Sequence, residues 1–236
     1  MIRLLICTCI SYVLLSCNSS DTQVKKESKE TVVKNNLDSL KRVAQPGDLI
    51  LRTGDDMLSE QIKYLNTKDP SYSHAGMIVE KNGQKMVGHI YPHESPADTI
   101  QYIAIDSFAN PATNLRCALY RYNLSAAERD SLMRTINFFK ANGVHFDKHY
   151  DLSTDKQMYC SEMIAKALNK ATNGRIHCKE DKVPKRMRPL IAAYFKKLGF
   201  TPKLIDERKF ISLDNLYILP ECQLVMKFPL KYFPGQ

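Results

Sequence analysis

Cys160 is the residue of this 236-residue chain best placed to act as a nucleophile. It precedes apolar residues that recur on one face of an expected helix, namely Met163, Ile164, Ala167, Leu168 and Ala171. A thiol in the first helical turn meets the positive end of the helix dipole and backbone N–H groups without helical partners, and both favour the thiolate. The pattern therefore predicts a reactive Cys160 with a lowered pKa; the alternative is an ordinary buried cysteine.

A nucleophilic cysteine needs a base and a group that orients the base, and His74 is the candidate base. It lies in an expected strand over residues 73–80. Asn82-Gly83 then predicts a two-residue hairpin turn into a second strand over residues 85–91. In the register that this turn sets, His74 and His89 lie on one face of the sheet as diagonal neighbours. We therefore expect His89 to orient His74.

Other residues of the hairpin are weaker candidates for the orienting group. Tyr91 lies opposite His74 in the same register and is the reserve candidate. Glu80 shares the face but lies six residues along the strand, on the order of 20 Å away. Gly76 leaves room beside the two imidazole rings. A register slip of one residue would turn His89 to the opposite face, so the assignment depends on the position of the turn.

The spacing His89-x-x-x-His93 also occurs in zinc-binding helices, where both histidines lie on one face. Pro92 and the strand pattern are incompatible with such a helix here. We therefore expect no metal site, and the thiol chemistry needs no cofactor.

Three segments in this order resemble the YiiX/YebB-like family of circularly permuted papain-like amidohydrolases in the NlpC superfamily. They are residues 47–50, 72–77 and 146–162, and the resemblance extends over residues 46–228. It implies an α+β fold with helices packed on an antiparallel sheet, Cys160 as nucleophile and His74 as base. His89 falls where relatives often have Glu. With His at this position, the chain resembles the lecithin retinol acyltransferase branch, which uses two histidines and a cysteine.

The resemblance implies thiol-dependent cleavage of an amide bond through an acyl-enzyme, on a peptide, a cell-wall peptide or another N-acyl compound. Acyl transfer or lipid deacylation by the same three residues is the first alternative, and a binding module without catalysis is the second. Tyr72, Tyr159 and Glu162 are candidate substrate-binding residues. For Glu162 the main expectation is complementation of the helix dipole or an internal ion pair, and binding of a substrate amine is the alternative.

A small set of elements must position these residues. Ser125 and Glu128 form a capping box at the start of a helix that ends at Gly143. The helix that carries Cys160 is expected over residues 159–173, before Gly174. Beyond the hairpin we expect strands at residues 49–52, 99–105, 115–122 and 221–228, and a helix at residues 57–65.

The N-terminus has the pattern of a bacterial lipoprotein signal peptide over residues 1–16. An apolar run too short to span a membrane ends in Leu14-Leu15-Ser16-Cys17, which predicts lipidation of Cys17; the alternative is an ordinary cleaved signal peptide. Residues 17–44 are polar and predict a flexible tether, with a short helix at residues 32–40 as an option. The catalytic domain is expected over residues 45–236. We therefore expect a lipid-anchored protein of the bacterial cell envelope, in an oligomeric state that the sequence leaves open.

The composition of 44% hydrophobic and 25% charged residues is typical of a globular protein and excludes a disordered or multi-span membrane chain. Residues 179–209 carry ten basic residues against four acidic ones. This segment either holds an anionic surface or forms a solvated basic face, and nucleic acid is not an expected partner of an exported lipoprotein. Cys117, Cys178 and Cys222 allow at most one disulfide.

Overall fold

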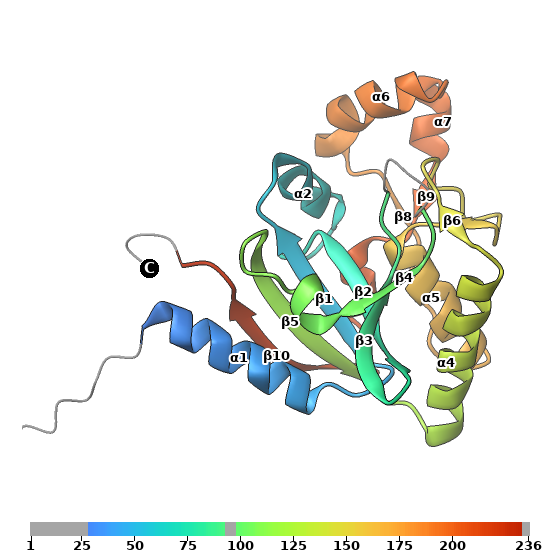
Figure 1. Cartoon of the computed structure of the whole chain (residues 1–236). Coiled ribbons are helices and arrows are strands. Elements are labelled where there is room, and N and C mark those ends of the chain that lie inside the picture. The colour runs from blue at the N-terminus through green and yellow to red at the C-terminus, as the bar shows by residue number, and fades with distance from the viewer. Residues whose placement is uncertain (1–27, 93–97, 233–236) are drawn as a thin grey trace, which may run out of the picture.

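The computed structural model describes residues 28–92 and 98–232 of the chain. At its centre lies a six-stranded sheet in which all neighbouring strands are antiparallel (Figure 1). The strands run in the order β10 (Cys222–Pro229), β5 (Asn114–Tyr122), β1 (Leu49–Gly54), β2 (His74–Lys81), β3 (Gln84–His89) and β4 (Gln101–Ala104). Helices pack on this sheet, which confirms the predicted α+β class.

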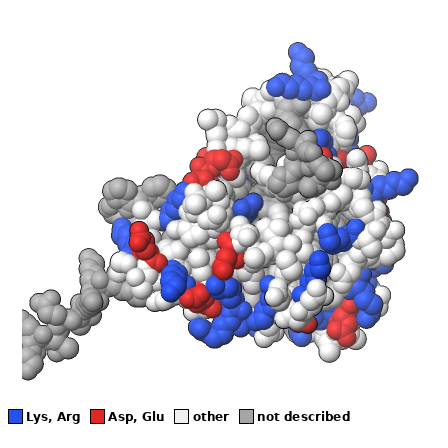
Figure 2. Space-filling view, viewed as in Figure 1, with Lys and Arg blue, Asp and Glu red and all other residues white. Residues whose placement is uncertain are grey.

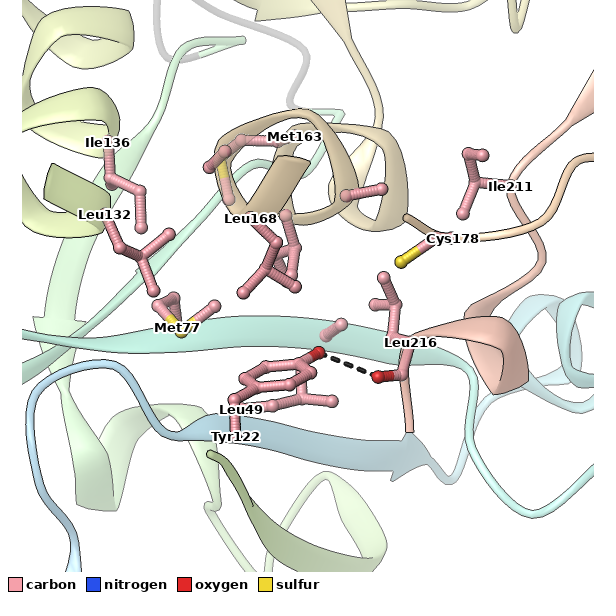
Figure 3. Close-up of a cluster of buried hydrophobic side chains, with 14 of the residues drawn as sticks. Leu49, Met77, Tyr122, Leu132, Ile136, Met163, Leu168, Cys178, Ile211 and Leu216 are labelled. Carbon is pink, nitrogen blue, oxygen red and sulfur yellow. Dashed lines mark hydrogen bonds between the residues drawn. The ribbon is translucent and has the colours of Figure 1, made fainter. Parts of the chain in front are cut away.

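One face of the sheet is covered by α4 (Ala126–Ala141) and α5 (Cys160–Ala171). Because side chains alternate along a strand, Leu49 and Met77 point to this face and pack with apolar residues of both helices (Figure 3). The Tyr122 hydroxyl closes the same core by donating a hydrogen bond to a backbone carbonyl of η3 (Leu213–Leu216) at 2.8 Å.

The predicted helix signals at this face are confirmed. Ser125 caps α4, and its hydroxyl oxygen accepts from the Glu128 N–H at 3.2 Å while the Glu128 carboxylate accepts from the Ser125 N–H at 2.8 Å. The apolar stripe of α5 is buried from Met163 to Ala171. Helix α5 begins at Cys160, one residue later than expected.

The second face of the sheet is covered by α1 (Lys29–Val43) and α3 (Ile105–Phe108). The optional short helix at residues 32–40 is present and longer than expected, so the prediction of a flexible tether is wrong for residues 29–43. Residues 17–27 lie outside the described part. In α1 only Val33 and Leu40 are buried, so its apolar positions are too few to give a clear sequence pattern. Those two residues cover apolar strand residues that would otherwise face water.

A smaller lobe stands above the sheet at the top of Figure 1 and contains most of the basic segment. Its core consists of apolar residues such as Phe195, Phe200 and Ile205. The lobe contains β8 (Asp181–Lys182), η2 (Lys185–Met187), α6 (Arg188–Lys197), α7 (Pro202–Glu207) and β9 (Lys209–Phe210). Opposite this lobe lie α2 (Met57–Ile62) and η1 (Lys63–Leu65), which together form the helix expected over residues 57–65.

A short parallel pair, β6 (His145–Phe146) and β7 (Gln157–Met158), leads the chain into α5. The loop between them is organised by buried Asp147, whose carboxylate accepts hydrogen bonds from the N–H groups of His149 and Asp151. In residues 28–92 and 98–232, no helix combines the length and the apolar character needed to cross a membrane.

Candidate active site

The hairpin of β2 and β3 brings His74 and His89 together. Asn82-Gly83 has φ values of 52° and 73°, as the two central residues of a type I′ turn require. The strand register is the predicted one, with Ile78 opposite Val87. His74 Nε2 lies 2.9 Å from His89 Nδ1, within hydrogen-bond distance. The predicted neighbouring positions of the two imidazoles are confirmed.

Aromatic rings hold the two imidazoles in place. The Phe108 ring centroid lies 5.6 Å from both histidine rings, and the Tyr91 ring contacts His74 edge to face at 5.3 Å. The space beside Gly76 is occupied by neighbouring side chains. A Cβ atom at Gly76 would lie 2.4 Å from a Val87 methyl carbon and 3.3 Å from the Phe108 ring. A side chain at this position would therefore displace the residues that fix the histidines.

Arg52 is a candidate functional residue that the sequence analysis missed. It lies opposite His74 in the pairing of β1 with β2, so the two side chains share one face of the sheet. Its guanidinium carbon lies 4.9 Å from the Phe108 ring centroid, and Nη1 donates to the Asn114 side-chain oxygen at 3.1 Å. The sequence feature that could have indicated Arg52 is its position directly after three apolar strand residues, where a charged side chain is unexpected.

The surroundings of His74 keep its imidazole neutral. Burial lowers the pKa of His74 well below the usual value of 6.5, and His89 and the Arg52 charge lower it further. A neutral imidazole has one nitrogen that can accept a proton. Nε2 of His74 contacts His89, so in the tautomer that carries its proton on Nε2 the acceptor is Nδ1. This arrangement suits a general base.

Cys160 is half-buried at the first position of α5, directly after the extended residue Tyr159. Burial raises the pKa of the Cys160 thiol. The backbone N–H groups of Ala75 and Ser161 oppose this shift without reversing it. The predicted lowering of the pKa is therefore wrong, because protein rather than water encloses the start of the helix. Burial thus favours the neutral form of both the Cys160 thiol and the His74 imidazole.

A cavity of about 440 Å³ is lined by four of the predicted site residues, whereas His89 is not among its lining residues. Cys160 and His74 both line it. The two predicted substrate-binding tyrosines, Tyr72 and Tyr159, also lie in its wall. The Tyr159 hydroxyl accepts a hydrogen bond from the Ile211 N–H at 2.6 Å, which fixes that ring. The structure thus brings the nucleophile, the base and both tyrosines to the wall of one cavity.

Glu162 does not line this cavity. Its side chain is fully buried, and its carboxylate accepts from the Tyr159 N–H at 3.3 Å and pairs with Lys166 at 3.0 Å. Burial raises the pKa of Glu162 to about 7. The alternative role in binding a substrate amine is therefore wrong, because the lysine and the helix start already occupy the carboxylate. The main expectation of an internal ion pair is confirmed.

Three further cysteines lie in the described part of the chain: Cys117, Cys178 and Cys222 are buried free thiols. Burial raises the pKa of Cys117 and of Cys178 to about 12. Of the described cysteines, Cys160 alone is more than slightly exposed. Over residues 28–92 and 98–232 there is no group of three or more His, Cys, Asp or Glu residues that could hold a metal ion. His93 and Cys17 lie outside the described residues.

Residues 43–188 match the sequence pattern of a known family, described as "Permuted papain-like amidase enzyme, YaeF/YiiX, C92 family". The match covers more than half of the chain. The chain belongs to this family. It is therefore a permuted papain-like enzyme of the cysteine amidase class, in agreement with the fold and the enzyme class that the sequence predicted.

The fold is also similar to a solved structure from Escherichia coli O157:H7, titled "Crystal structure of metalloprotein yiiX from Escherichia coli O157:H7, DUF1105". The TM-score is 0.63 at 23% sequence identity, and the similarity covers 78% of this chain and 97% of that chain. At this identity the similarity supports the permuted papain-like fold. A search of curated proteins found no match.

The family match covers part of the molecule only. His74, His89 and Cys160 lie within residues 43–188. Nearly all of α6, together with α7 and β9, lies after the matched residues. All of α1 except its last residue lies before them. The catalytic candidates thus lie within the matched residues, and most of the smaller lobe lies outside them.

Proposed function

We propose that this protein hydrolyses an amide bond through an acyl-enzyme on Cys160, with His74 as the base and His89 as the residue that orients His74. The observation that carries the proposal is the 2.9 Å contact between His74 Nε2 and His89 Nδ1 beside a cavity that Cys160 also lines. Membership in a family of permuted papain-like amidases supports an amide as the bond that is cleaved.

In the first step the Cys160 sulfur attacks the substrate carbonyl carbon while the thiol proton moves to His74 Nδ1. The C–N bond then breaks, and His74 gives the proton to the leaving amine, so that a thioester remains on Cys160. Water next attacks the thioester with His74 accepting its proton, the C–S bond breaks, and the proton restores the thiol. The net reaction converts an amide and water into a carboxylic acid and an amine.

The electrostatics of the site set the order of these events. Because thiol and imidazole are both neutral at rest, proton transfer accompanies the attack, and negative charge develops on the carbonyl oxygen. The Cys160 backbone N–H, at the start of α5, has no helical partner and is a donor for this oxyanion. The mechanism uses the tautomer in which His74 carries its proton on Nε2 and donates it to His89 Nδ1, 2.9 Å away, which leaves Nδ1 of His74 as the base.

The test is hydrolysis of N-acyl aminocoumarin amides of different acyl groups by wild type and variants. Cys160→Ala is expected to abolish turnover, and His74→Ala to lower kcat by roughly 10²–10⁴-fold, the usual contribution of a general base. His89→Ala should lower kcat with little change in KM, because His89 contacts the base. Acid quenching should trap the acyl group on Cys160, as measured by peptide mass.

The matched control is Glu80→Gln, a carboxylate on the same strand whose side chain is exposed. It should retain the wild-type rate. Hydrolysis that survives Cys160→Ala, or an acyl group trapped on another residue, would contradict the proposed mechanism.

A further inference from the structure

Helix α6 has an outer face that differs from the outer face of an ordinary surface helix. Ile191 and Phe195, four positions apart, belong to the core of the smaller lobe. The opposite face consists of exposed residues, namely Pro189, Leu190, Ala193, Lys196 and Lys197. A helix at the surface of a soluble protein usually turns polar and charged residues to solvent along its whole length. In α6 the middle of the exposed face is apolar instead.

The charges of this helix are all of one sign. Its ten residues include no acidic residue, although acidic residues four positions from lysines are common on solvated helices. Lys185 lies in η2, directly before the helix, and Lys196 and Lys197 lie in its last turn. We use the term basic-apolar face for Lys185, Pro189, Leu190, Ala193, Lys196 and Lys197.

The protein does not neutralise the lysines of the basic-apolar face. Other basic residues of the lobe have carboxylate partners, as Arg188 has in Asp206 at 3.0 Å. Within residues 28–92 and 98–232, no carboxylate forms an ion pair with Lys185, Lys196 or Lys197. The dipole of α6 favours lysines at its C-terminal end but leaves their charge in place. These cations are therefore available to an external partner.

A partner of this face must offer both negative charge and hydrocarbon. A second copy of the chain is unsuitable, because two such faces in contact would bring lysines against lysines. A hydrophilic polyanion in solution supplies the charge but leaves Leu190 and Ala193 without an apolar contact. A bilayer with anionic lipids supplies both, because an interfacial helix lies about 5–10 Å deep, at the boundary between headgroups and acyl chains.

We propose that the basic-apolar face of α6 binds the surface of a membrane that contains anionic lipids. The helix would lie parallel to the membrane plane, with Leu190 and Ala193 below the headgroups and the lysines at the level of the phosphates. Lysine suits this place, because its methylene groups lie along apolar surface while its ammonium group reaches the headgroups. The proposal depends neither on the reaction at Cys160 nor on a lipid at Cys17.

The position of α6 in the molecule leaves the basic-apolar face accessible. Helix α6 lies at the outer end of the smaller lobe in Figure 1, and Lys and Arg side chains project at the same end of the molecule in Figure 2. Leu190 is 41% exposed although it also borders the cavity at Cys160. A lobe bound to a membrane would therefore hold one wall of this cavity next to the lipid headgroups.

The contact is expected to be weak by itself and to depend on salt. Each lysine near an anionic membrane raises the affinity about fivefold. The attraction decays within the Debye length, which is about 10 Å at 0.1 M salt and about 3 Å at 1 M. Binding of this strength orients a protein at a membrane without holding it there permanently.

The chain contains no tryptophan, so an introduced indole reports on its own surroundings. The experiment adds Ala193→Trp to the Cys17→Ala chain, which cannot be lipidated at that position. The vesicles consist of phosphatidylcholine, alone or mixed with phosphatidylglycerol. With the anionic vesicles the fluorescence should shift to shorter wavelength and be quenched by brominated lipids, and with phosphatidylcholine alone it should stay unchanged. Phe138→Trp is the matched control, at a residue of α4 that is 55% exposed, and its fluorescence should not change with either vesicle.

Sedimentation with the same vesicles measures the affinity. Lys196→Gln combined with Lys197→Gln should weaken binding to the anionic vesicles about 25-fold. Lys156→Gln combined with Lys170→Gln removes two exposed charges outside the lobe and should leave the affinity unchanged. Equal losses in both double variants would overturn the proposal, because the attraction would then be general. Binding with an unchanged Ala193→Trp spectrum, or no binding to the anionic vesicles at low salt, would also overturn it.

Discussion

Arg52 places a positive charge beside two groups whose protonation decides the reaction. It lowers the pKa of His74 and also the pKa of Cys160. The first effect keeps the base neutral in weakly acidic solution, and the second favours the thiolate over the thiol. A single charge on β1 thus acts on both partners in the direction that nucleophilic attack requires.

Removal of this charge has a defined consequence for the pH dependence of Cys160. In the wild type the rate at which iodoacetamide alkylates Cys160 should increase with pH as the thiol ionises, with a midpoint above the ordinary thiol value of 9.0 because burial raises the pKa of Cys160. Arg52→Gln removes a cation that opposes protonation, so the midpoint should move to higher pH. The same change raises the pKa of Cys160, and the alkylation rate near pH 7.5 should decrease.

Arg116→Gln is the control for this experiment, because it removes the same charge from an exposed position on β5. Its pH profile should coincide with that of the wild type. A midpoint that stays in place in Arg52→Gln would show that the Arg52 charge does not reach the site.

At the scale of elements, α5 combines a nucleophile at its first residue with a buried carboxylate two residues later. Glu162 receives the Tyr159 N–H and pairs with Lys166, so it satisfies a donor at the start of the helix and forms an ion pair at the same time. Burial nevertheless raises its pKa to about 7, compared with an ordinary value of 4.5. The ionised form is therefore less stable in the folded protein than in water.

This shift predicts a pH dependence of stability. A carboxyl group with a raised pKa contributes stability that is fully present below about pH 4.5 and is lost as the pH rises through about 7. The loss amounts to about 3 kcal/mol at most. Glu162→Gln keeps the acceptor for Tyr159 but does not titrate, so the wild type should lose stability relative to this variant between pH 5 and 8.

Urea denaturation at pH 5, 6, 7 and 8 gives the free energy of unfolding for this comparison. Asp155→Asn is the matched control, because it removes the exposed second carboxylate that pairs with Lys166. Its stability should run parallel to that of the wild type across this range. Parallel curves for Glu162→Gln would contradict the raised pKa.

At the scale of the whole molecule, the site lies where the end of the sheet, the start of α5 and the smaller lobe meet. Helices cover both faces of the sheet, so β1 and β2 are buried almost throughout. Lys and Arg side chains project from the lobe at the top of Figure 2. Several of these charges are paired, such as Arg188 with Asp206 at 3.0 Å and Lys209 with Glu180 at 3.2 Å.

We propose that the whole protein is held at a bacterial membrane by a lipid on Cys17. Cys17→Ala should then move the protein from the membrane fraction to the soluble fraction, as measured by fractionation and immunoblotting. If the variant stays with the membranes, fractionation in high salt separates two causes, because salt weakens only an attachment through the basic lobe. Release of the variant by salt would identify the lobe as a second anchor, and retention would contradict lipid anchoring through Cys17.

The sequence by itself determined the features that depend on local patterns. Asn82-Gly83 fixes the turn and therefore the register, so the neighbouring positions of His74 and His89 followed from a few residues of one hairpin. The apolar stripe of α5 and the capping box of α4 likewise depend on residues that lie three or four positions apart in the sequence. The order of the motifs was sufficient to predict the family.

Only the tertiary structure decided the features that depend on segments far apart in the chain. The pKa of Cys160 follows from burial by distant elements, which outweighs the local effect of the helix start. Helix α1 buries only Val33 and Leu40, and both lie against the second face of the sheet. In the cavity beside Cys160, residues 58–65 and 183–213 both contribute to the lining although more than 100 positions separate them, and an apolar residue that lines a cavity has the same sequence pattern as one in a core.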